Sequence, residues 1–289
     1  MPLHKLYNSQ FENTMNGQNT NILCNVSDLP ELTRLQHFQD ANAKKDDLQA
    51  TSWDTNPPVI VLAGGLGTRL RTLDPLQPKP MIQVKGKPFL YWLFQHYIQQ
   101  GFKDFLVSTG HQAQVIETYP WHVDFPQARF VFYREEKPLG TGGAVRNIFE
   151  KNPSLHGCWV LNGDTFLPHF LPLYLEDFLA TFLVLEQNEL FDATSNLLVH
   201  GQYVIGEKIP GDYFDAGAVF TKKQAILNRS ELQVSNPPFS LHQLLKAPMQ
   251  NQQVGYIVLP GTCYDIGTPE RYKRFENYLD KKEQDVQRT

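Results

Sequence analysis

The sequence has few cysteines, no long apolar run and no signal for export. Its 289 residues include only Cys24, Cys158 and Cys263, which are far apart and form no C-x-x-C pair. This pattern argues against a disulfide framework and a structural zinc site, and it favours a reducing compartment. The N-terminus lacks the apolar core of a signal peptide, and no apolar run approaches the roughly 20 residues that a membrane helix needs. We therefore expect a soluble, cytoplasmic protein without a membrane partner.

Positive charge is also scarce. The 26 Lys and Arg residues are outnumbered by 30 Asp and Glu residues, which gives a net charge of −4. No run of Lys or Arg is longer than two. Binding to a nucleic-acid backbone normally requires a basic surface, so we expect no nucleic-acid partner and interpret any nucleotide ligand as a small molecule. With 41% hydrophobic residues, the chain can still bury the core of one large domain.

Residues 1–56 differ in composition from the rest of the chain. They are rich in Asn and Gln, show no convincing strand pattern, and run into the turn-forming residues NPP. One helix is predicted from Pro30 to about Gln49. The sequence thus predicts a polar appendage at 1–56 and a main domain at 57–289. A helix of this kind can pack on the main domain or on a second subunit, so a homo-oligomer is among the expected assemblies.

From Val59 onward, short β-rich segments alternate with helical ones. Strands are predicted at 59–63, 104–110, 129–135 and 158–162, and helices at 88–100, 114–119 and 142–151. Such alternation indicates parallel strands with helices on both faces. After Asp164 the segments are more typical of added or antiparallel strands, and a final helix is predicted from 269 to 282. We predict an α/β, Rossmann-like, mainly parallel sheet with an added small antiparallel portion.

The most informative stretch is VIVLAGGLGTRLRTLDPLQPKP, residues 59–80. Gly64, Gly65 and Gly67 follow an apolar strand, where glycines let the backbone approach a phosphate and turn amides point at its oxygens. An ordinary tight turn explains these glycines equally well. Arg69 and Lys79 favour a phosphate loop, because phosphoryl and nucleotidyl transfer require cations near the phosphates. Neither a Walker A loop nor the dinucleotide pattern G-x-G-x-x-G is found here.

The segments AGGLGTRL (63–70) and PKPM (78–81) together resemble the signature of the sugar-1-phosphate nucleotidylyltransferase family. Further segments resemble the family's other motifs in the family's order: EKPLGTGGA (136–144), LNGDTF (161–166), IGEKIP (205–210), YFDAGAVF (213–220) and YDIGTPERY (264–272). Motifs that keep their order over residues 58–280 are much more specific than any one of them alone. The antiparallel portion is then expected to bind the sugar.

The resemblance also implies roles for single residues. The implied catalytic residues are Arg69, Lys79, Asp164 and Asp265, of which Asp164 and Asp265 would hold Mg²⁺ through hard oxygen ligands. The implied nucleotide-binding residues are Ala63, Gly64, Gly65, Gly67, Thr68, His111, Gly140, Thr141 and Gly142. The implied sugar-phosphate-binding residues are Gly163, Glu207, Lys208, Asp215 and Gly217.

Each of these residue types also has a simpler interpretation. Asp164 after an apolar strand fits the cap of a turn, and Asp265 fits the N-terminal cap of the last helix. Lys208 fits a solvated surface. Residues 140–142 fit a turn that begins a helix, and His111 fits an ordinary surface or core histidine. The order of the motifs is what favours the functional interpretation.

The reaction that the resemblance implies is Mg²⁺-dependent attack of a sugar 1-phosphate on the α-phosphorus of a nucleoside triphosphate, with release of pyrophosphate. Within the family, EKPLGTGGA and VLNGDTF look most like the bacterial heptose-1-phosphate guanylyltransferases. The expected substrates are therefore GTP and a heptose 1-phosphate, for surface polysaccharide synthesis. UTP-dependent transfer to a hexose or N-acetylmuramate 1-phosphate is an alternative. A regulatory protein that binds a nucleotide sugar without turnover is the alternative from another class.

Overall fold

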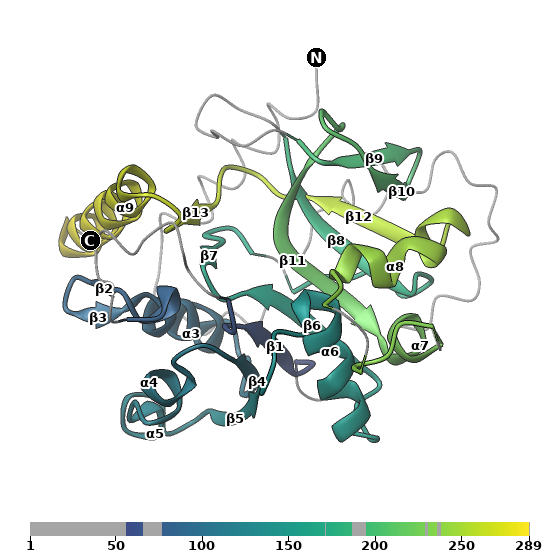
Figure 1. Ribbon diagram of the computed structural model, residues 1–289. Helices are drawn as coiled ribbons and strands as arrows, with labels where there is room; N and C mark the ends of the chain where they lie inside the picture. The colour runs from purple at the N-terminus through teal and green to yellow at the C-terminus, as the bar shows by residue number, and fades with distance from the viewer. Residues whose placement is uncertain are drawn as a thin grey trace, which may run out of the picture. The chain divides into compact units, whose positions relative to one another are not determined.

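A nine-stranded sheet forms the centre of the part of the chain that the computed structural model describes, namely residues 56–65, 77–170, 172–186, 195–228, 231–235 and 238–288 (Figure 1). The strand order is β5-β4-β1-β6-β11-β8-β12-β10-β9. In that order, the strands are Arg129–Arg134, Asp104–Thr109, Val59–Leu62, Gly157–Asn162, Phe214–Lys222, Ala180–Leu185, Val254–Val258, Tyr203–Glu207 and Leu197–His200. Two small antiparallel sheets pair β2 (Gln83–Val84) with β3 (Lys87–Pro88), and β7 (Thr165–Phe166) with β13 (Tyr264–Asp265).

One half of the large sheet is parallel. β1 pairs in parallel with β4 and with β6, and β4 pairs in parallel with β5. Alternate residues of β1 enter opposite cores: Val59 and Val61 enter one, and Ile60 enters the other. Strands buried on both faces need continuous apolar sequence, which explains the runs that predicted them. The predicted strands of this half are confirmed to within one residue at each end.

β11 joins this parallel half to the rest of the sheet. It runs antiparallel to β6 and to β8. β12 is parallel to β8, whereas β10 is antiparallel to both β12 and β9. Only β11 and β10 therefore run against the common direction within the described sheet. The sheet is mainly parallel and has antiparallel strands added to it, which confirms the predicted fold class.

Helices cover both faces of the sheet. One core contains residues of α3 (Phe89–Gln99), α4 (Ala113–Glu117), α5 (Trp121–Asp124) and α9 (Pro269–Arg288). The other contains residues of α6 (Gly140–Lys151), α7 (Lys223–Leu227) and α8 (Leu241–Gln250). α9 extends beyond its predicted end, and α5, α7, α8 and β12 were not predicted.

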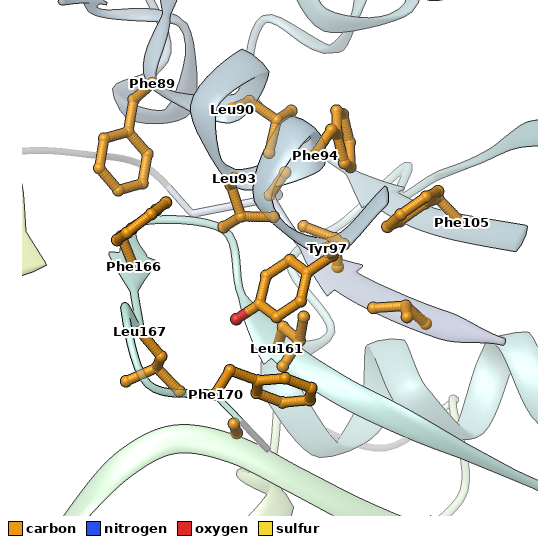
Figure 2. Packing of buried hydrophobic residues seen from close by; sticks show 14 of the residues in the cluster. Phe89, Leu90, Leu93, Phe94, Tyr97, Phe105, Leu161, Phe166, Leu167 and Phe170 are labelled. Atoms are coloured by element: carbon orange, nitrogen blue, oxygen red, sulfur yellow. The ribbon is translucent and has the colours of Figure 1, made fainter. Parts of the chain in front are cut away.

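The core beneath α3 fixes the segment that follows β6 (Figure 2). Tyr97 packs edge-on against Phe170, with ring centroids 4.8 Å apart, and Phe89 and Phe166 both contact Phe275 of α9. Phe166 and Leu167 are each 2% exposed. Burying side chains of this size stabilises the fold by about 1.5–3 kcal/mol each, so the chain is held firmly just after Asp164.

Part of the sequence-based prediction lies outside the described residues: the helix at 30–49 with the rest of the appendage up to residue 55, and Gly67, Thr68 and Arg69. Asn56 is described, and its side-chain amide donates a hydrogen bond of 2.9 Å to the carbonyl of Gln100 at the end of α3. Among the described helices, none combines the length and the apolar character needed to cross a membrane.

Candidate active site

A pocket of about 800 Å³ lies at the carboxyl ends of the parallel strands β1, β4, β5 and β6. Open α/β sheets bind their ligands at this edge, because the loops that leave parallel strands meet there. The pocket brings together many of the residues predicted from the sequence: Ala63, Gly64, Gly65, Lys79, His111, Gly140, Thr141, Asp164 and Asp265. The described residues Gly142, Gly163, Glu207, Lys208, Asp215 and Gly217 are not part of its lining.

The glycine loop after β1 packs closely against the ends of β4 and β5. The Ala63 amide donates to the carbonyl of Ser108 at 2.9 Å, and a Cβ atom on Gly64 would lie 2.7 Å from Oε1 of Glu135. A Cβ atom on Gly65 would meet nothing within 4 Å. A side chain at Gly64 would thus displace the carboxylate of Glu135, whereas Gly65 leaves open space at the pocket where a ligand can approach the backbone.

Glu135, which the sequence did not single out, ties three elements of the pocket together. Its Oε1 accepts a hydrogen bond of 2.8 Å from the buried hydroxyl of Ser108, and its Oε2 accepts one of 2.9 Å from the Leu139 amide. These contacts join the ends of β4 and β5 to the start of α6. Glu135 is partly buried, and both of its carboxylate oxygens have partners, so it acts as a structural residue of the pocket wall.

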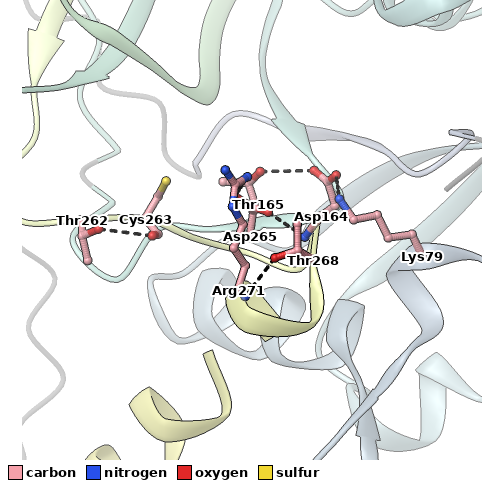
Figure 3. A network of polar contacts seen from close by, with 9 residues as sticks. Lys79, Asp164, Thr165, Thr262, Cys263, Asp265, Thr268 and Arg271 are labelled. Atoms are coloured by element: carbon pink, nitrogen blue, oxygen red, sulfur yellow. Dashed lines mark hydrogen bonds and ion pairs between the residues drawn. The ribbon is translucent and has the colours of Figure 1, made fainter. Parts of the chain in front are cut away.

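Lys79 and Asp164 form an ion pair in the pocket (Figure 3). Lys79 begins the short 3₁₀ helix η3 (Lys79–Met81), where Pro78 and Pro80 restrict its backbone. Asp164 follows β6 and also accepts a hydrogen bond of 3.2 Å from the Thr165 hydroxyl. Both side chains remain partly exposed to the pocket, at 17% and 36%.

The pairing of β13 with β7 brings Asp265 next to Asp164. Asp265 stands opposite Thr165 in this pair, and the Ile266 amide donates to the Asp164 carbonyl at 3.3 Å. Oδ1 of Asp265 accepts from the Gly267 amide at 2.6 Å, and Oδ2 lies 2.9 Å from Nη1 of Arg271 (Figure 3). Arg271 also lines the pocket and was not predicted, although it lies in the motif YDIGTPERY.

The chemistry of these carboxylates fits a magnesium ion that binds together with phosphates. Mg²⁺ is usually held by one or two carboxylates, several waters and substrate phosphates. Asp164 and Asp265 supply two carboxylates on one pocket. Within the described ranges, no group of three or more His, Cys, Asp or Glu side chains is arranged as a closed metal cage.

Residues 140–142 form the first turn of α6 instead of preceding the helix, which corrects the predicted boundary. Gly140 and Thr141 line the pocket at this helix N-terminus, where backbone amides favour anions. The Gly142 amide instead donates to the Phe239 carbonyl at 3.0 Å, and a Cβ atom there would lie 2.4 Å from the Ser240 carbonyl oxygen. Gly142 thus allows α6 to pack on the residues before α8, and its amide is not directed at a ligand.

Four of the predicted sugar-phosphate residues belong to β10, β11 and the residue after β10. Glu207 ends β10, Lys208 follows it, and Asp215 lies in β11 just before a bulge. Gly217 has a φ of +74°, and a Cβ atom on it would lie 2.6 Å from Nδ2 of Asn162, which lines the pocket. The sugar-side strand β11 therefore touches the pocket wall at Gly217.

Gly163 is also a packing position. A Cβ atom on Gly163 would lie 2.7 Å from the carbonyl oxygen of Leu62, so only glycine lets the turn after β6 approach the end of β1. This close approach sets the position of Asp164, the next residue.

His242 stands beside the predicted sugar-phosphate residues and was not predicted. Its Nδ1 lies 3.0 Å from Oε1 of Glu207, and its Nε2 lies 3.1 Å from Oδ2 of Asp215. The sequence did carry one signal for its position: S-L-H-Q, residues 240–243, is a capping box that marks a helix start.

Comparisons with known proteins agree with this architecture. The sequence model of the nucleotidyl transferase family matches residues 58–191. The D-glycero-alpha-D-manno-heptose 1-phosphate guanylyltransferase of Aneurinibacillus thermoaerophilus is 30% identical over 236 residues, which cover 76% of this chain and 97% of that protein. The protein of the same name from Campylobacter jejuni subsp. jejuni serotype O:2 is 31% identical over 222 residues, with coverages of 75% and 97%.

A solved structure is also similar. The crystal structure of HddC from Yersinia pseudotuberculosis complexed with GMP-PN superposes with a TM-score of 0.63 at 28% sequence identity, covering 77% of this chain and 99% of that one. The pocket at the ends of the parallel strands, the paired aspartates and the matches over nearly the whole length of the relatives lead to one conclusion. The chain belongs to the nucleotidyl transferase family, among the sugar-1-phosphate nucleotidylyltransferases.

Proposed function

We propose that this protein transfers the guanylyl group of GTP to a heptose 1-phosphate in the presence of Mg²⁺, giving a GDP-heptose and pyrophosphate. The observation that carries the proposal is the match to two heptose 1-phosphate guanylyltransferases over 97% of the length of each. The HddC structure in complex with GMP-PN supports a guanine nucleotide as the donor.

In the proposed reaction, a phosphate oxygen of the sugar 1-phosphate attacks the α-phosphorus of GTP. The bond from the α-phosphorus to the oxygen that bridges to the β-phosphate breaks, and pyrophosphate leaves with that bonding pair. The attacking phosphate is already anionic, so no side chain has to remove a proton. Burial, with Asp265 nearby, raises the pKa of the Cys263 thiol to about 12, which keeps this neighbouring cysteine protonated. The task of the protein is therefore to align two polyanions.

The basic side chains of the pocket support this task. Lys79 and Arg271 are paired with Asp164 and Asp265, respectively, and both line the pocket. We assign Asp164 and Asp265 to Mg²⁺, which when bound supplies positive charge beside the reacting phosphates. Lys79 and Arg271 then exchange their carboxylate partners for phosphate oxygens. Arg69, outside the described residues, is assigned to the triphosphate from its motif alone.

The pocket also offers groups for the base and the phosphates. We assign the backbone of Gly64 and Gly65 and the N-terminus of α6 at Gly140 and Thr141 to phosphate oxygens. His111, an exposed residue after β4, is assigned to the base edge. Guanine and uracil present different donors and acceptors, so fixed polar partners separate GTP from UTP by a large factor.

The test compares kcat/KM for GTP, UTP, CTP and dTTP, each with the 1-phosphates of heptose, mannose, glucose and N-acetylated sugars. Pyrophosphate release is the measured signal. The expected result is the highest value for GTP with a heptose 1-phosphate, and loss of turnover when EDTA removes Mg²⁺. A preference for UTP with an N-acetylated sugar would contradict the substrate assignment and leave the transferase reaction standing. Binding of a nucleotide sugar without any turnover would support the regulatory alternative instead.

A further inference from the structure

His242 is held at a fixed position by the start of α8. The Ser240 hydroxyl accepts from the Gln243 amide at 3.0 Å, and the Gln243 side chain accepts from the Ser240 amide at 2.7 Å. This capping box fixes the first turn, in which His242 is the second residue. α8 packs against β10 and β12 and against α6 (Figure 1). His242 is therefore presented to the sheet by a rigid element.

The surroundings of His242 consist of one aromatic ring and two carboxylates. The imidazole stacks on the ring of Phe182 with an interplanar angle of 3° and a centroid distance of 5.3 Å, and its side chain is only 18% exposed. Glu207 of β10 faces Nδ1, and Asp215 of β11 faces Nε2. These are the charged groups that face His242 from the strands packed against it, since Phe182 of β8 carries no charge.

This arrangement selects the protonated ring. Carboxylates only accept hydrogen bonds, and a neutral imidazole would point a lone pair at one of them. Nε2 of His242 is close enough to Oδ2 of Asp215 for an ion pair, but the geometry does not meet the criteria for a hydrogen bond. Charge attraction therefore dominates this contact. Burial lowers the pKa of His242, but Asp215 and then Glu207 raise it, and its net pKa lies above the usual 6.5.

The His242 cluster is connected to the pocket on two sides. Oδ1 of Asp215 accepts from the Gly217 amide at 2.8 Å, and Gly217 lies against Asn162 of the pocket wall. The Leu241 amide, next to His242, donates to Oγ1 of Thr141 at 2.9 Å. A sugar 1-phosphate that reaches this cluster brings hydroxyl groups, which carboxylates accept, and a phosphate, which carboxylates repel. The motifs also assign Lys208, which follows Glu207, to this phosphate. Glu207 and Asp215 carry two negative charges, which oppose binding of the anion unless further positive charge offsets them.

We propose that His242 is a positioning residue for the sugar 1-phosphate: its imidazolium holds the carboxylates of Glu207 and Asp215 as acceptors for sugar hydroxyls and offsets their charge toward the phosphate. This inference rests on the proposed function, because Glu207 and Asp215 are assigned to the sugar by their motifs. It adds a residue that those motifs do not contain, and it makes recognition of the sugar dependent on the charge of one histidine.

The first test compares His242→Gln with the matched control His122→Gln, which changes an exposed histidine of α5. For His242→Gln we expect KM for the sugar 1-phosphate to rise about tenfold, while KM for GTP stays within about twofold. The control should change neither. Equal KM values for the sugar phosphate in the wild type and in His242→Gln would overturn the proposal. An equal rise in both KM values would also overturn it, because it would indicate general damage to the fold.

The second test is the pH profile of kcat/KM for the sugar phosphate. Because the pKa of His242 is raised, its imidazole is fully protonated below pH 6.5. We expect kcat/KM to be highest there and to fall as the pH rises through the pKa of His242 in the folded protein. His242→Lys keeps a cation and should move this fall toward about pH 10, whereas His242→Gln should lack it. Titration of the sugar phosphate near pH 6 is common to all variants and cancels in the comparison. A fall that persists in His242→Gln would exclude His242 as its cause.

Calorimetric binding of the sugar 1-phosphate separates this inference from the proposed function. If the wild type binds the sugar phosphate but releases no pyrophosphate, the proposed reaction fails and the role of His242 is still tested. A dissociation constant about tenfold weaker in His242→Gln, with recovery in His242→Lys, would support the positioning role. An unchanged constant would overturn it, and absence of binding to the wild type would overturn both proposals.

Discussion

Two regions of the molecule pair carboxylates with basic side chains, and the basic residues differ between them. At the pocket, Asp164 pairs with Lys79 and Asp265 pairs with Arg271. In the second region, which we propose to bind the sugar 1-phosphate, His242 lies between the carboxylates of Glu207 and Asp215. Lys and Arg side chains normally stay charged at neutral pH, whereas histidine changes its charge there. In the proposed reaction, the phosphate chemistry thus depends on fixed charges, and recognition of the sugar 1-phosphate depends on a charge that changes with pH.

The largest effect is expected from the fixed-charge region. Asp164→Asn or Asp265→Asn removes one negative charge from the proposed metal site with little change in volume. Loss of such a ligand removes several kcal/mol of transition-state stabilisation, so kcat should fall by about 10³-fold or more at saturating Mg²⁺. The measurement is steady-state pyrophosphate release, with circular dichroism to verify the fold.

Asp177→Asn is the matched control, because Asp177 is exposed in a turn before β8. It should leave kcat unchanged. Near wild-type activity of Asp164→Asn at saturating Mg²⁺ would show that Asp164 does not hold the metal, and the same holds for Asp265. Either result would break the contrast between the two regions.

An intermediate effect is expected where the two regions meet. Gly142→Ala would place a Cβ atom 2.4 Å from the Ser240 carbonyl oxygen and 2.7 Å from a ring carbon of Phe239. Overpacking of this kind destabilises a protein by about 1–3 kcal/mol. We expect a loss of that size in the free energy of unfolding, measured by urea denaturation, together with higher KM values for both substrates, because α6 and α8 must move apart.

Gly65→Ala provides the contrast, since a Cβ atom on Gly65 meets nothing within 4 Å. Its free energy of unfolding should stay within about 0.5 kcal/mol of the wild type, while KM for GTP rises. If Gly142→Ala were as stable as Gly65→Ala, the close packing of α6 on residues 239–240 would be refuted.

The smallest effect is expected from a segment that belongs to neither region. We propose that residues 1–55 are not needed for chemistry, because every described pocket residue lies after Pro58. The cut leaves Asn56, which binds the end of α3. Deletion should leave kcat/KM within about twofold of the wild type. Light scattering would check the oligomeric state, and an inactive truncated protein with unchanged fold and assembly would contradict this separation.

The two regions also differ in how far the sequence predicts them. In the parallel half of the sheet, apolar runs bounded by glycine predicted the strands. The order of the motifs pointed to Lys79, Asp164 and Asp265, and these three residues line one pocket. The meeting of Asp164 and Asp265 depends on the pairing of β7 with β13, a long-range contact that no local pattern encodes.

In the region around β10, β12 and α8, tertiary contacts override the local secondary-structure preferences of the sequence. α8 contains Pro248, which normally ends a helix, yet the helix continues to Gln250 and begins with a capping box. β12 contains Gly255, a residue type that is weak in strands. A Cβ atom there would lie 2.6 Å from Cδ1 of Leu175 and 3.2 Å from ring atoms of Phe178, so these side chains pack against the glycine. His242 was missed because its partners lie on other strands, and a single histidine carries no pattern of its own.

The position of β11 has a consequence for synthesis of the chain. β1, β4, β5 and β6 can pair as soon as residue 162 has emerged from the ribosome, but the outer edge of β6 pairs only with β11, which ends at Lys222. While the intervening residues are translated, an apolar strand with unpaired backbone groups stands at the sheet edge. Such edges are templates for intermolecular pairing. The order of the strands thus leaves this edge of β6 without its native partner until β11 has been synthesised.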